Sequence, residues 1–249
     1  MQDSFGSLWE TLYHSQVITM IGAGGKTTAL VRLIQELSAH GTKVIATTTT
    51  KVYPIDCATI WVDVIPPPDD IRYPCFWYKE ESNDGKWIGP DTEKVEEAID
   101  YDKNHNNNRV WIIEGDGARS LYLKCWAGHE PQIPSNTDCV VLIISAGLWG
   151  KTLHSKDVHR PEYCKDLIDR TWNTQTFWNY LQYSPVCRLK LKNTSWVVLF
   201  NETSCSGQNI LNQVKLLESD KKNAVLGDRA FPRFAVGNVK EGLIRWLDL

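Results

Sequence analysis

The sequence lacks the features typical of membrane-spanning and nucleic-acid-binding proteins. Its longest uninterrupted apolar runs, residues 139–144 and 196–200, are far shorter than the roughly 20 residues that a membrane-spanning helix needs. The formal net charge is −3, so no excess of basic residues predicts a nucleic-acid surface. The first residues include Asp3 and no basic side chain, which is not typical of a signal peptide.

Cysteine pairs with metal-binding or redox spacing are also missing. The seven cysteines are widely spaced, and no two of them form a C-x-x-C motif. This pattern favours reduced thiols and a cytoplasmic location over a disulfide framework or a zinc site. No internal repeat or low-complexity linker divides the 249 residues, so we expect a single domain over residues 1–249.

The most informative segment is a glycine-rich turn after the apolar run 17–21. It consists of Gly22, Ala23, Gly24, Gly25, Lys26, Thr27 and Thr28. These residues match the short phosphate-loop pattern G-x-x-G-K-T, and a helical pattern of apolar residues follows them. Glycines allow backbone N–H groups to converge on an anion, and the helix N-terminus adds partial positive charge. We expect Lys26 to contact the β- and γ-phosphates of a nucleotide and the Thr27 hydroxyl to bind Mg²⁺.

Two carboxylates follow the next long apolar run, residues 110–113. Glu114 and Asp116 are separated by one glycine, so an extended chain places both side chains on the same side. A carboxylate at the end of a neighbouring strand usually fixes the metal of a phosphate loop. We predict that one acid binds Mg²⁺ and the other positions a nucleophile, with Lys26 completing the catalytic set. The alternative is an acidic turn at the surface.

Further polar residues stand where a second, anionic substrate would bind. They are Thr49, Lys51, Arg119, Lys124, His129, Glu130, His159 and Arg160. Ligands of an open α/β sheet lie beyond the carboxyl ends of its strands, and a threonine-rich segment follows the predicted strand 43–46. Its threonines are also good strand formers. The remaining candidates would alternatively be part of solvated loops.

Strands alternate with helical patterns along the chain. We predict strands at 17–21, 43–46, 110–113, 139–144 and 196–200, and helices after Thr28 and at 92–101, 161–183 and 239–249. The unit 17–46 predicts a parallel pair with a crossover helix. Asp84-Gly85 predicts a hairpin inserted within residues 60–90. The fold class is α/β, a three-layer P-loop NTPase-like fold with a mostly parallel central sheet and an inserted hairpin.

The last strand is followed by Asn201, where some nucleotide-binding proteins have an Asn-Lys-x-Asp motif that recognises guanine. Here the run is Asn201-Glu202-Thr203-Ser204, which lacks both the lysine and the aspartate. ATP is therefore the expected nucleotide, with Mg²⁺ as its metal. A Rossmann dehydrogenase is disfavoured because the glycines lead to Lys26 and Thr27 instead of a third glycine.

Together these segments resemble the YqeC family, described as accessory proteins of selenium-dependent molybdenum hydroxylases. The resemblance rests on four motifs in register, at residues 22–28, 48–51, 114–118 and 129–131, the last of which is His-Glu-Pro. Lys124 and His159-Arg160 also look like family positions, whereas Gly115 and Arg119 stand where the family has alanine and lysine. The resemblance implies a cytoplasmic protein that helps to mature the selenium-containing molybdenum cofactor, with a hydroxylase or a maturation protein as partner.

Three functions agree with this sequence. The first is Mg-dependent ATP hydrolysis or phosphoryl transfer in cofactor maturation. The second is an ATP-dependent ligase or kinase that acts on a small anionic substrate, which the short form of the loop suggests. The third is a non-catalytic, nucleotide-gated chaperone or carrier that docks on a hydroxylase. We expect the first of these.

Overall fold

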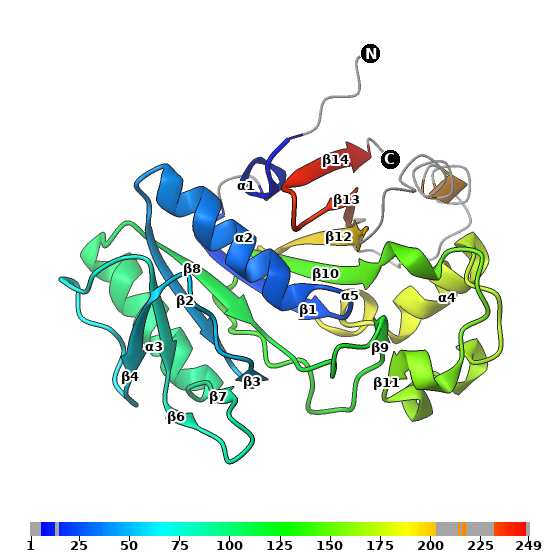
Figure 1. Ribbon diagram of the computed structural model, residues 1–249, viewed down its shortest axis with the longest axis horizontal. Helices are drawn as coiled ribbons and strands as arrows, with labels where there is room; N and C mark the ends of the chain where they lie inside the picture. Colours follow the sequence, from blue (N-terminus) through cyan, green and yellow to red (C-terminus); the bar gives the residue numbers. More distant parts are fainter. Residues whose placement is uncertain (1–5, 13–14, 203–213, 215, 218–231, 248–249) are drawn as a thin grey trace.

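A nine-stranded sheet forms the centre of the computed structural model, which describes residues 6–12, 15–202, 214, 216–217 and 232–247 (Figure 1). Its strands are β1 (Val17–Gly22), β2 (Lys43–Thr48), β4 (Thr59–Val62), β5 (Cys75–Tyr78), β8 (Arg109–Glu114), β10 (Cys139–Ser145), β12 (Ser195–Asn201), β13 (Arg233–Asn238) and β14 (Leu243–Leu247). They are ordered β14-β13-β12-β10-β1-β8-β2-β5-β4. Only the β13–β14 pair is antiparallel, so the sheet is mostly parallel, as predicted.

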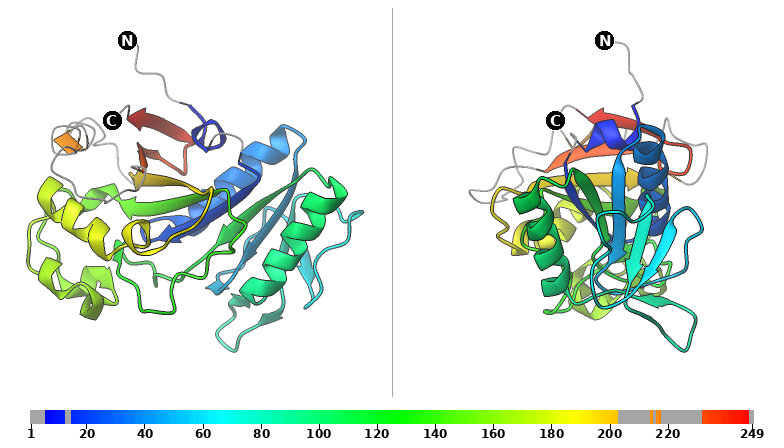
Figure 2. Two further views of the ribbon diagram at one scale, coloured as in Figure 1. Left: turned by 180° about the vertical axis from the view of Figure 1, so that it is seen from behind. Right: turned by 90° about the vertical axis from the view of Figure 1, so that its left-hand side faces the viewer.

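Helices cover both faces of this sheet. They are α1 (Leu8–Thr11), α2 (Lys26–Ala39), α3 (Thr92–His105), α4 (Thr174–Tyr183) and α5 (Pro185–Arg188). Helices α1 and α2 pack in one core with Ile18 and Met20 of β1, whereas α3 packs with Val17 on the opposite face. Helices α4 and α5 lie on the same side as α3 (Figure 2). The three-layer α/β architecture is therefore confirmed.

The helix that follows the glycine-rich turn has the predicted apolar face. Leu30, Leu33, Ile34 and Leu37 are fully buried against the sheet. The helix ends before Gly41, whose φ of +72° is a left-handed conformation that glycine adopts at helix C-termini. Burial of this face fixes the start of α2, and with it the turn, at the carboxyl edge of β1.

Strands β1 and β2 are parallel but are not neighbours. Strand β8 lies between them and pairs with both, with Met20 and Thr48 each opposite Glu114. The predicted adjacent pair within residues 17–46 is therefore wrong. The local pattern correctly identifies two parallel strands joined by a crossover helix, but it does not show that β8, which comes later in the chain, lies between them. The consequence is functional, because it brings Glu114 next to the turn after β1.

The inserted hairpin exists in a shorter form than predicted. Strands β6 (Glu80–Glu81) and β7 (Trp87–Ile88) flank the Asp84-Gly85 turn, and β3 (Lys51–Val52) pairs with β7 to form a small three-stranded sheet. The run Cys75–Tyr78, expected in the hairpin, instead forms β5 of the main sheet. All four of its residues are buried, as in a strand covered on both faces.

The predicted helix at 161–183 was wrong in extent. Within 161–183 only α4 is α-helical, with Asn173 accepting the Thr176 N–H at its start. The residues before it form the 3₁₀ turns η3 (Pro161–Tyr163) and η4 (Lys165–Leu167), and two more, η1 (Ala146–Leu148) and η2 (Ser155–Asp157), precede them. His159, two residues before this predicted helix, is the last residue of β11 (Val158–His159), which pairs with β9 (Leu123–Lys124).

The predicted C-terminal helix at 239–249 is strand β14, as far as the structure describes it. Gly242 has a φ of +69°, so the chain turns there and pairs antiparallel with β13. Leu243 is half exposed and Ile244 is buried, which is the alternation of a strand. Among the helices that the structure describes, none combines the length and the apolar character needed to cross a bilayer.

Candidate functional site

The glycine-rich turn connects the carboxyl end of β1 to the start of α2 (Figure 1). From residue 24 to residue 28, no backbone N–H donates a hydrogen bond within the described part of the chain. The first bond of the helical type joins Ala29 N to Gly25 O at 2.9 Å. These donors and the positive end of the α2 dipole offer a site for an anion.

Asn201, at the end of β12, holds this turn in place. Its Nδ2 donates to Gly24 O at 2.7 Å, and its Oδ1 accepts the Val239 N–H at 3.1 Å. A Cβ on Gly25, whose φ is +128°, would collide with the Asn201 amide. The sequence prompted only the question of base recognition at Asn201. The structure shows a structural role, and residues 203 and 204 of that run lie outside the described residues.

The predicted catalytic residues lie together. Lys26 Nζ donates to Gly22 O at 2.7 Å and lies 3.3 Å from Asp116 Oδ1 and 3.8 Å from Glu114 Oε1. Thr27 Oγ1 donates to Glu114 Oε2 at 2.9 Å. The two acids therefore converge on Lys26 from the segment after β8. This acidic segment is not a turn at the surface, since both carboxylates are buried.

The two acids have different surroundings. Asp116 is completely buried, and its carboxylate accepts the Gly22 N–H at 3.1 Å and the Trp126 Nε1–H at 2.6 Å. Glu114 lines the open cleft described below. Burial raises the pKa of Glu114 above its ordinary value, while Lys26 and Thr27 act against this rise. Asp116 therefore supports the loop from below, and Glu114 faces the space where a ligand would bind.

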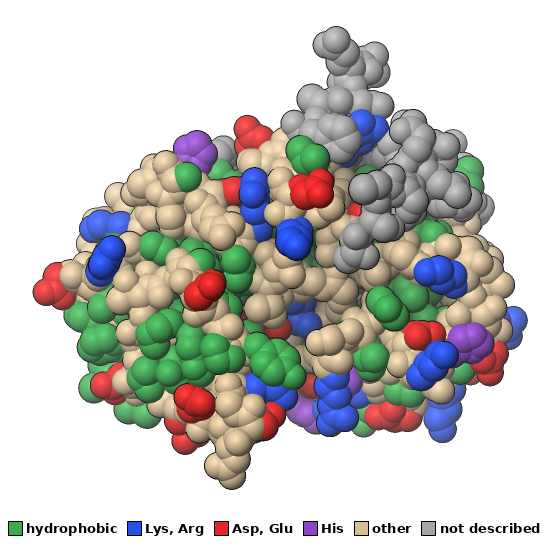
Figure 3. All heavy atoms as spheres, in the orientation of Figure 1, with side chains coloured by type: hydrophobic (Ala, Val, Ile, Leu, Met, Phe, Trp, Pro, Cys, Tyr) green, Lys and Arg blue, Asp and Glu red, His purple; other side chains and the backbone are tan. Residues whose placement is uncertain are grey.

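A cleft of about 1460 Å³ lies beside the turn. Its boundaries come from the glycine-rich turn, the segment after β8, the three-stranded sheet, strand β11 and the residues that follow β12 and β13. In Figure 1, β3, β7, β9 and β11 lie below the carboxyl ends of β1 and β8. In Figure 3, Lys, Arg and His side chains gather in the lower centre of the same face. The cleft is therefore larger and more basic than the phosphate loop alone.

Five of the eight predicted second-substrate residues line this cleft: Lys51, Arg119, Glu130, His159 and Arg160. They come from three separate segments, after β2, after β8 and at β11. Only the tertiary structure brings these segments to one space. All five therefore share one cleft with the glycine-rich turn, and their role as substrate-binding residues stays a prediction.

The other three, Thr49, Lys124 and His129, do not line it. The Thr49 hydroxyl donates to Gln132 O at 2.7 Å. Lys124 is fully buried, with Nζ 3.0 Å from Glu130 Oε1 and 3.9 Å from Asp116 Oδ2. His129 is exposed at the surface, and its carbonyl oxygen accepts a hydrogen bond from Gln132. Lys124 therefore connects Asp116 to Glu130 beneath the cleft without facing a ligand.

Positive charge dominates the electrostatics around β11. Glu130 lies 2.8 Å from Arg160 Nε and also pairs with Lys124. Burial would raise the Glu130 pKa, but Lys124 and Arg160 outweigh burial and lower it. Burial, and then the charges of Lys124, Arg160 and Arg119, lower the pKa of His159 to about 4. His159 is therefore neutral at pH 7 and has hydrogen-bonding capacity without charge.

Sequence reasoning missed several cleft residues, among them Tyr53, Lys86, Tyr122, Ser145 and Lys240. Ser145 could have been found, because it follows the apolar run 139–144 as Glu114 follows its own strand. The pair Lys86 and Tyr53, whose ammonium group and ring centroid are 5.0 Å apart, had no local signal. Pairing of β3 with β7 brings these two residues together.

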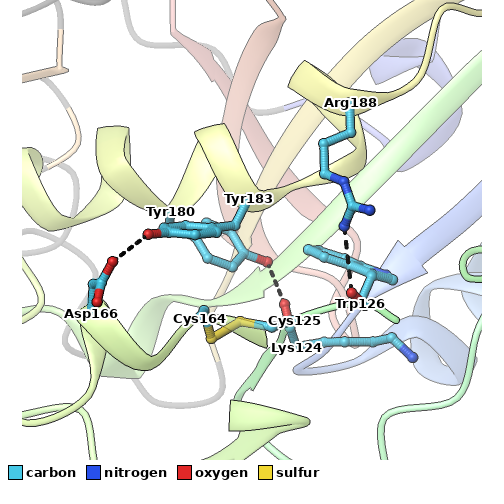
Figure 4. Close-up of a disulfide and its surroundings, with 8 residues drawn as sticks. All are labelled: Lys124, Cys125, Trp126, Cys164, Asp166, Tyr180, Tyr183 and Arg188. Carbon is cyan, nitrogen blue, oxygen red and sulfur yellow. Dashed lines mark hydrogen bonds between the residues drawn. A yellow bond between two sulfur atoms is a disulfide. The ribbon is translucent and has the colours of Figure 1, made fainter. Parts of the chain in front are cut away.

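A disulfide joins Cys125 and Cys164, with a Cα–Cα distance of 6.2 Å across 39 residues of sequence (Figure 4). The expectation of reduced thiols is therefore wrong for these two cysteines. Among the described residues, Cys57, Cys75, Cys139 and Cys187 form no disulfide. No spacing motif indicates this pair, because the two cysteines are 39 residues apart. They meet in the hydrophobic core that also contains Leu123 and Leu167.

The bridge supports the part of the site around β9 and β11. Cys125 directly follows Lys124, whose carbonyl oxygen accepts a hydrogen bond from Tyr180 Oη at 3.0 Å (Figure 4). Cys164 follows Arg160 by four residues. The disulfide thus ties the segment below the cleft to the segment that lines it, and α4 packs on both.

Comparison with known proteins assigns the chain to a family. Residues 18–162, more than half of the chain, match the family described as YqeC protein. The uncharacterized protein YqeC of Escherichia coli (strain K12) is 32% identical over 165 residues, which are 62% of this chain and 61% of that protein. This chain thus covers about three fifths of its relative's length. No solved structure matches the chain. The residues of the glycine-rich turn and of the cleft around β8, β9 and β11 fall within the matched region, and the chain belongs to the YqeC family.

Proposed function

We propose that this protein binds ATP with Mg²⁺ and catalyses ATP hydrolysis or phosphoryl transfer. The observation that supports this most strongly is the convergence of Lys26, Thr27 and Glu114 beneath an unpaired row of backbone N–H groups. A triphosphate needs donors for its oxygens, a cation for its charge and a carboxylate for its metal. All three are present at one strand end.

The residues around Thr27 fit a magnesium ion. Thr27 Oγ1 and Glu114 Oε2 are 2.9 Å apart. In an octahedral Mg²⁺ site with metal–oxygen distances of about 2.0–2.1 Å, adjacent ligand oxygens are also about 2.9 Å apart. The described residues contain no group of three or more His, Cys, Asp or Glu side chains placed to hold a metal. Mg²⁺ at nucleotide sites needs no such group, because phosphates and water supply most of its ligands.

Each residue of the cluster has a distinct role in this proposal. Lys26 exchanges its bond to Gly22 O for phosphate oxygens and offsets their charge. Thr27 and Glu114 hold Mg²⁺, which supplies electrostatic stabilisation of the transferred phosphoryl group. Asp116 positions Lys26 and the loop from its buried place. The catalysis is one of positioning and electrostatics.

ATP is the proposed nucleotide, because Asn201 is engaged with the loop and the run after it lacks a guanine-recognition motif. On the family resemblance, we propose that the activity serves maturation of the selenium-containing molybdenum cofactor in the cytoplasm. A molybdenum hydroxylase or a maturation protein would be the partner. These assignments derive from the resemblance and not from the site geometry.

One observation favours a second function, transfer of the phosphoryl group to a small anionic substrate by a ligase or kinase. The cleft of about 1460 Å³ exceeds the roughly 300–1,000 Å³ that a typical ligand site occupies. A hydrolase needs only water beside its nucleotide. The extra space with basic side chains therefore suits an acceptor.

Thermal unfolding with and without Mg-ATP tests the proposal. Ligand at about 100 times its dissociation constant adds roughly 2.7 kcal/mol, or about 5–11 °C for a chain of this size. We expect this shift in the wild type and in Lys156→Ala, which removes an exposed lysine outside the cleft. Lys26→Ala should show no shift relative to its own ligand-free form. An equal shift in Lys26→Ala, or none in the wild type, would refute the proposal, and Mg-GTP in parallel tests the choice of base.

A further inference from the structure

The basic side chains of the cleft form a second group, apart from the phosphate loop. We name it the basic wall and define it as Lys51, Lys86, Arg119, His159 and Arg160, all of which line the cleft. Lys86 and Tyr53 are in contact through the ring face, and Lys51 precedes Tyr53 by two residues on the same extended segment. The basic wall thus extends from the three-stranded sheet to β11.

Two cations of the basic wall lack a counter-ion. Lys51 and Arg119 are both exposed, and neither side chain forms a hydrogen bond or an ion pair with any described residue. Of the other charged members, Lys86 forms an ion pair with Asp84 at 2.7 Å, and the charge of Arg160 is only partly offset. Glu130 is shared between Lys124 and Arg160, so one carboxylate serves two cations.

The backbone of the basic wall is strained where its arginines are attached. Arg119, Ser120 and Arg160 have φ values of +49°, +57° and +61°. Left-handed conformations are costly for residues with side chains, and such strain clusters at ligand clamps. Three of the six non-glycine residues with positive φ among the described residues therefore line this one cleft.

The electrostatic field agrees with this geometry. The hydrogen bond to Asp84 raises the pKa of Lys86, and the positive charge of Arg119 acts against this rise to a smaller extent. Arg119 also contributes, after burial and Lys124, to the low pKa of His159. One arginine thus influences both ends of the basic wall. Lys51 and Arg119, which have no counter-ion among the described residues, offer positive charge that an anion bound in the cleft would offset.

We propose that the basic wall is a second binding subsite, which takes a small molecule with a phosphate or carboxylate group next to the nucleotide. Arg119 and Lys51 would bind the oxyanion directly, and neutral His159 would contribute one hydrogen bond. This inference rests on the proposed function, because it assigns the nucleotide to the phosphate loop. It extends that function by naming the chemical class of the acceptor.

Calorimetric titration of the full chain, saturated with Mg²⁺ and a non-hydrolysable ATP analogue, tests the subsite. The probes are inorganic phosphate and, in a separate arm, acetate, so that the two oxyanions are distinguished. The variants are Arg119→Gln and Lys51→Gln, whose side chains have no described partner to lose. Arg72→Gln is the matched control, because Arg72 is an exposed arginine that does not line the cleft.

We expect one of the two probes to bind, and each cleft variant to raise its dissociation constant about tenfold, since a hydrogen bond to a charged group is lost. The Arg72→Gln control should bind like the wild type. Equal binding by all variants overturns the subsite. So does complete competition between the probe and the analogue, because the oxyanion would then occupy the phosphate loop.

A second format separates failure of the subsite from failure of the proposed function. The same probe is titrated into Lys26→Ala without nucleotide, where the phosphate loop is impaired. Binding that persists there and still depends on Arg119 supports the subsite, even if the ATP analogue fails to bind the wild type. Loss of probe binding in Lys26→Ala, with a native circular dichroism spectrum, contradicts the subsite and leaves the phosphate loop as the anion site.

Discussion

Asn201 at the end of β12 and Gly24 in the glycine-rich turn are 177 residues apart in the chain and are joined by a hydrogen bond of 2.7 Å. The same side chain accepts the Val239 N–H. One amide thus connects the loop to the strand end at β12 and to the turn after β13. The loop depends for its shape on the far half of the sheet.

Asn201→Ala should therefore lower both stability and nucleotide affinity. The variant leaves Gly24 O and Val239 N without their partner, which costs about 1–3 kcal/mol. Urea unfolding measures the loss of stability, and the Mg-ATP-induced thermal shift measures the loss of nucleotide affinity. Asn83→Ala, at an exposed position in the hairpin turn, is the control and should match the wild type. Unchanged values in Asn201→Ala would show that the loop holds its shape unaided.

Lys26 and Asp116 should be energetically coupled, because each is buried and they lie 3.3 Å apart. Removing one partner of a buried pair costs about 3–5 kcal/mol, since a buried charge is left behind. We expect the double variant Lys26→Met/Asp116→Asn to lose less free energy of unfolding than the two single variants lose in sum, by at least about 1 kcal/mol. A double-mutant cycle measured by urea unfolding gives the coupling energy.

The exposed pair Lys94 and Glu97, 2.6 Å apart, is the control for that cycle. Surface pairs at helical spacing contribute about 0.5 kcal/mol or less. Coupling of Lys26 with Asp116 no larger than that of Lys94→Met with Glu97→Gln would mean that Asp116 does not hold Lys26. Its role would then be confined to the Gly22 and Trp126 hydrogen bonds.

Glu114→Gln should weaken Mg²⁺ binding more than nucleotide binding. The substitution keeps the size of the side chain but removes the charge that faces Thr27. We expect the Mg²⁺ concentration that gives half the ATP-induced thermal shift to rise about tenfold or more, as for the loss of one charged ligand. Glu97→Gln serves as the exposed control. The same Mg²⁺ dependence in Glu114→Gln and the wild type would place the metal elsewhere.

The low pKa of His159 predicts a pH dependence of stability. Its pKa is about 4 in the folded protein and about 6.5 in an unfolded chain. Between these values the unfolded state binds more protons, so the free energy of unfolding falls as pH decreases from 6.5 to 4. In His159→Gln this part of the slope should disappear. In the wild type, the NMR resonance of the His159 imidazole, assigned by its absence from the spectrum of His159→Gln, should titrate near pH 4. A midpoint above 6 would contradict the structure.

Removing the Cys125–Cys164 disulfide should destabilise the protein. For a closed loop of 39 residues, the chain-entropy account gives about 4 kcal/mol. Cys125→Ser/Cys164→Ser should unfold at lower temperature than the wild type under oxidising conditions, and the difference should vanish with a reductant. Cys57→Ser removes a free thiol and serves as the control. Peptide mapping without reduction should recover residues 125 and 164 in one linked pair, and their absence from it would disprove the bridge.

Much of the architecture follows from local sequence patterns. The continuous apolar runs that became β1, β8, β10 and β12, the amphipathic face of α2 and the order strand–loop–helix each have a local physical cause, so sequence was sufficient for them. The errors have a common cause as well. Residues 75–78 and 239–249 are short, and their type depends on what they pair with, which local pattern does not contain.

The local sequence is sufficient to specify the chemical groups available at the glycine-rich turn. Three glycines, Lys26 and Thr27 specify a turn of free N–H groups with one cation and one hydroxyl, because those properties are local to seven residues. It also placed Glu114 at the end of a buried strand.

The spatial arrangement of these groups depends on the fold as a whole. Insertion of β8 between β1 and β2 put Glu114 within 2.9 Å of Thr27 and left Asp116 buried below. Pairing of β3 with β7 and of β9 with β11 brought the basic wall to the same cleft. These contacts join residues that are tens of positions apart, so their formation depends on burial of whole elements and on no motif.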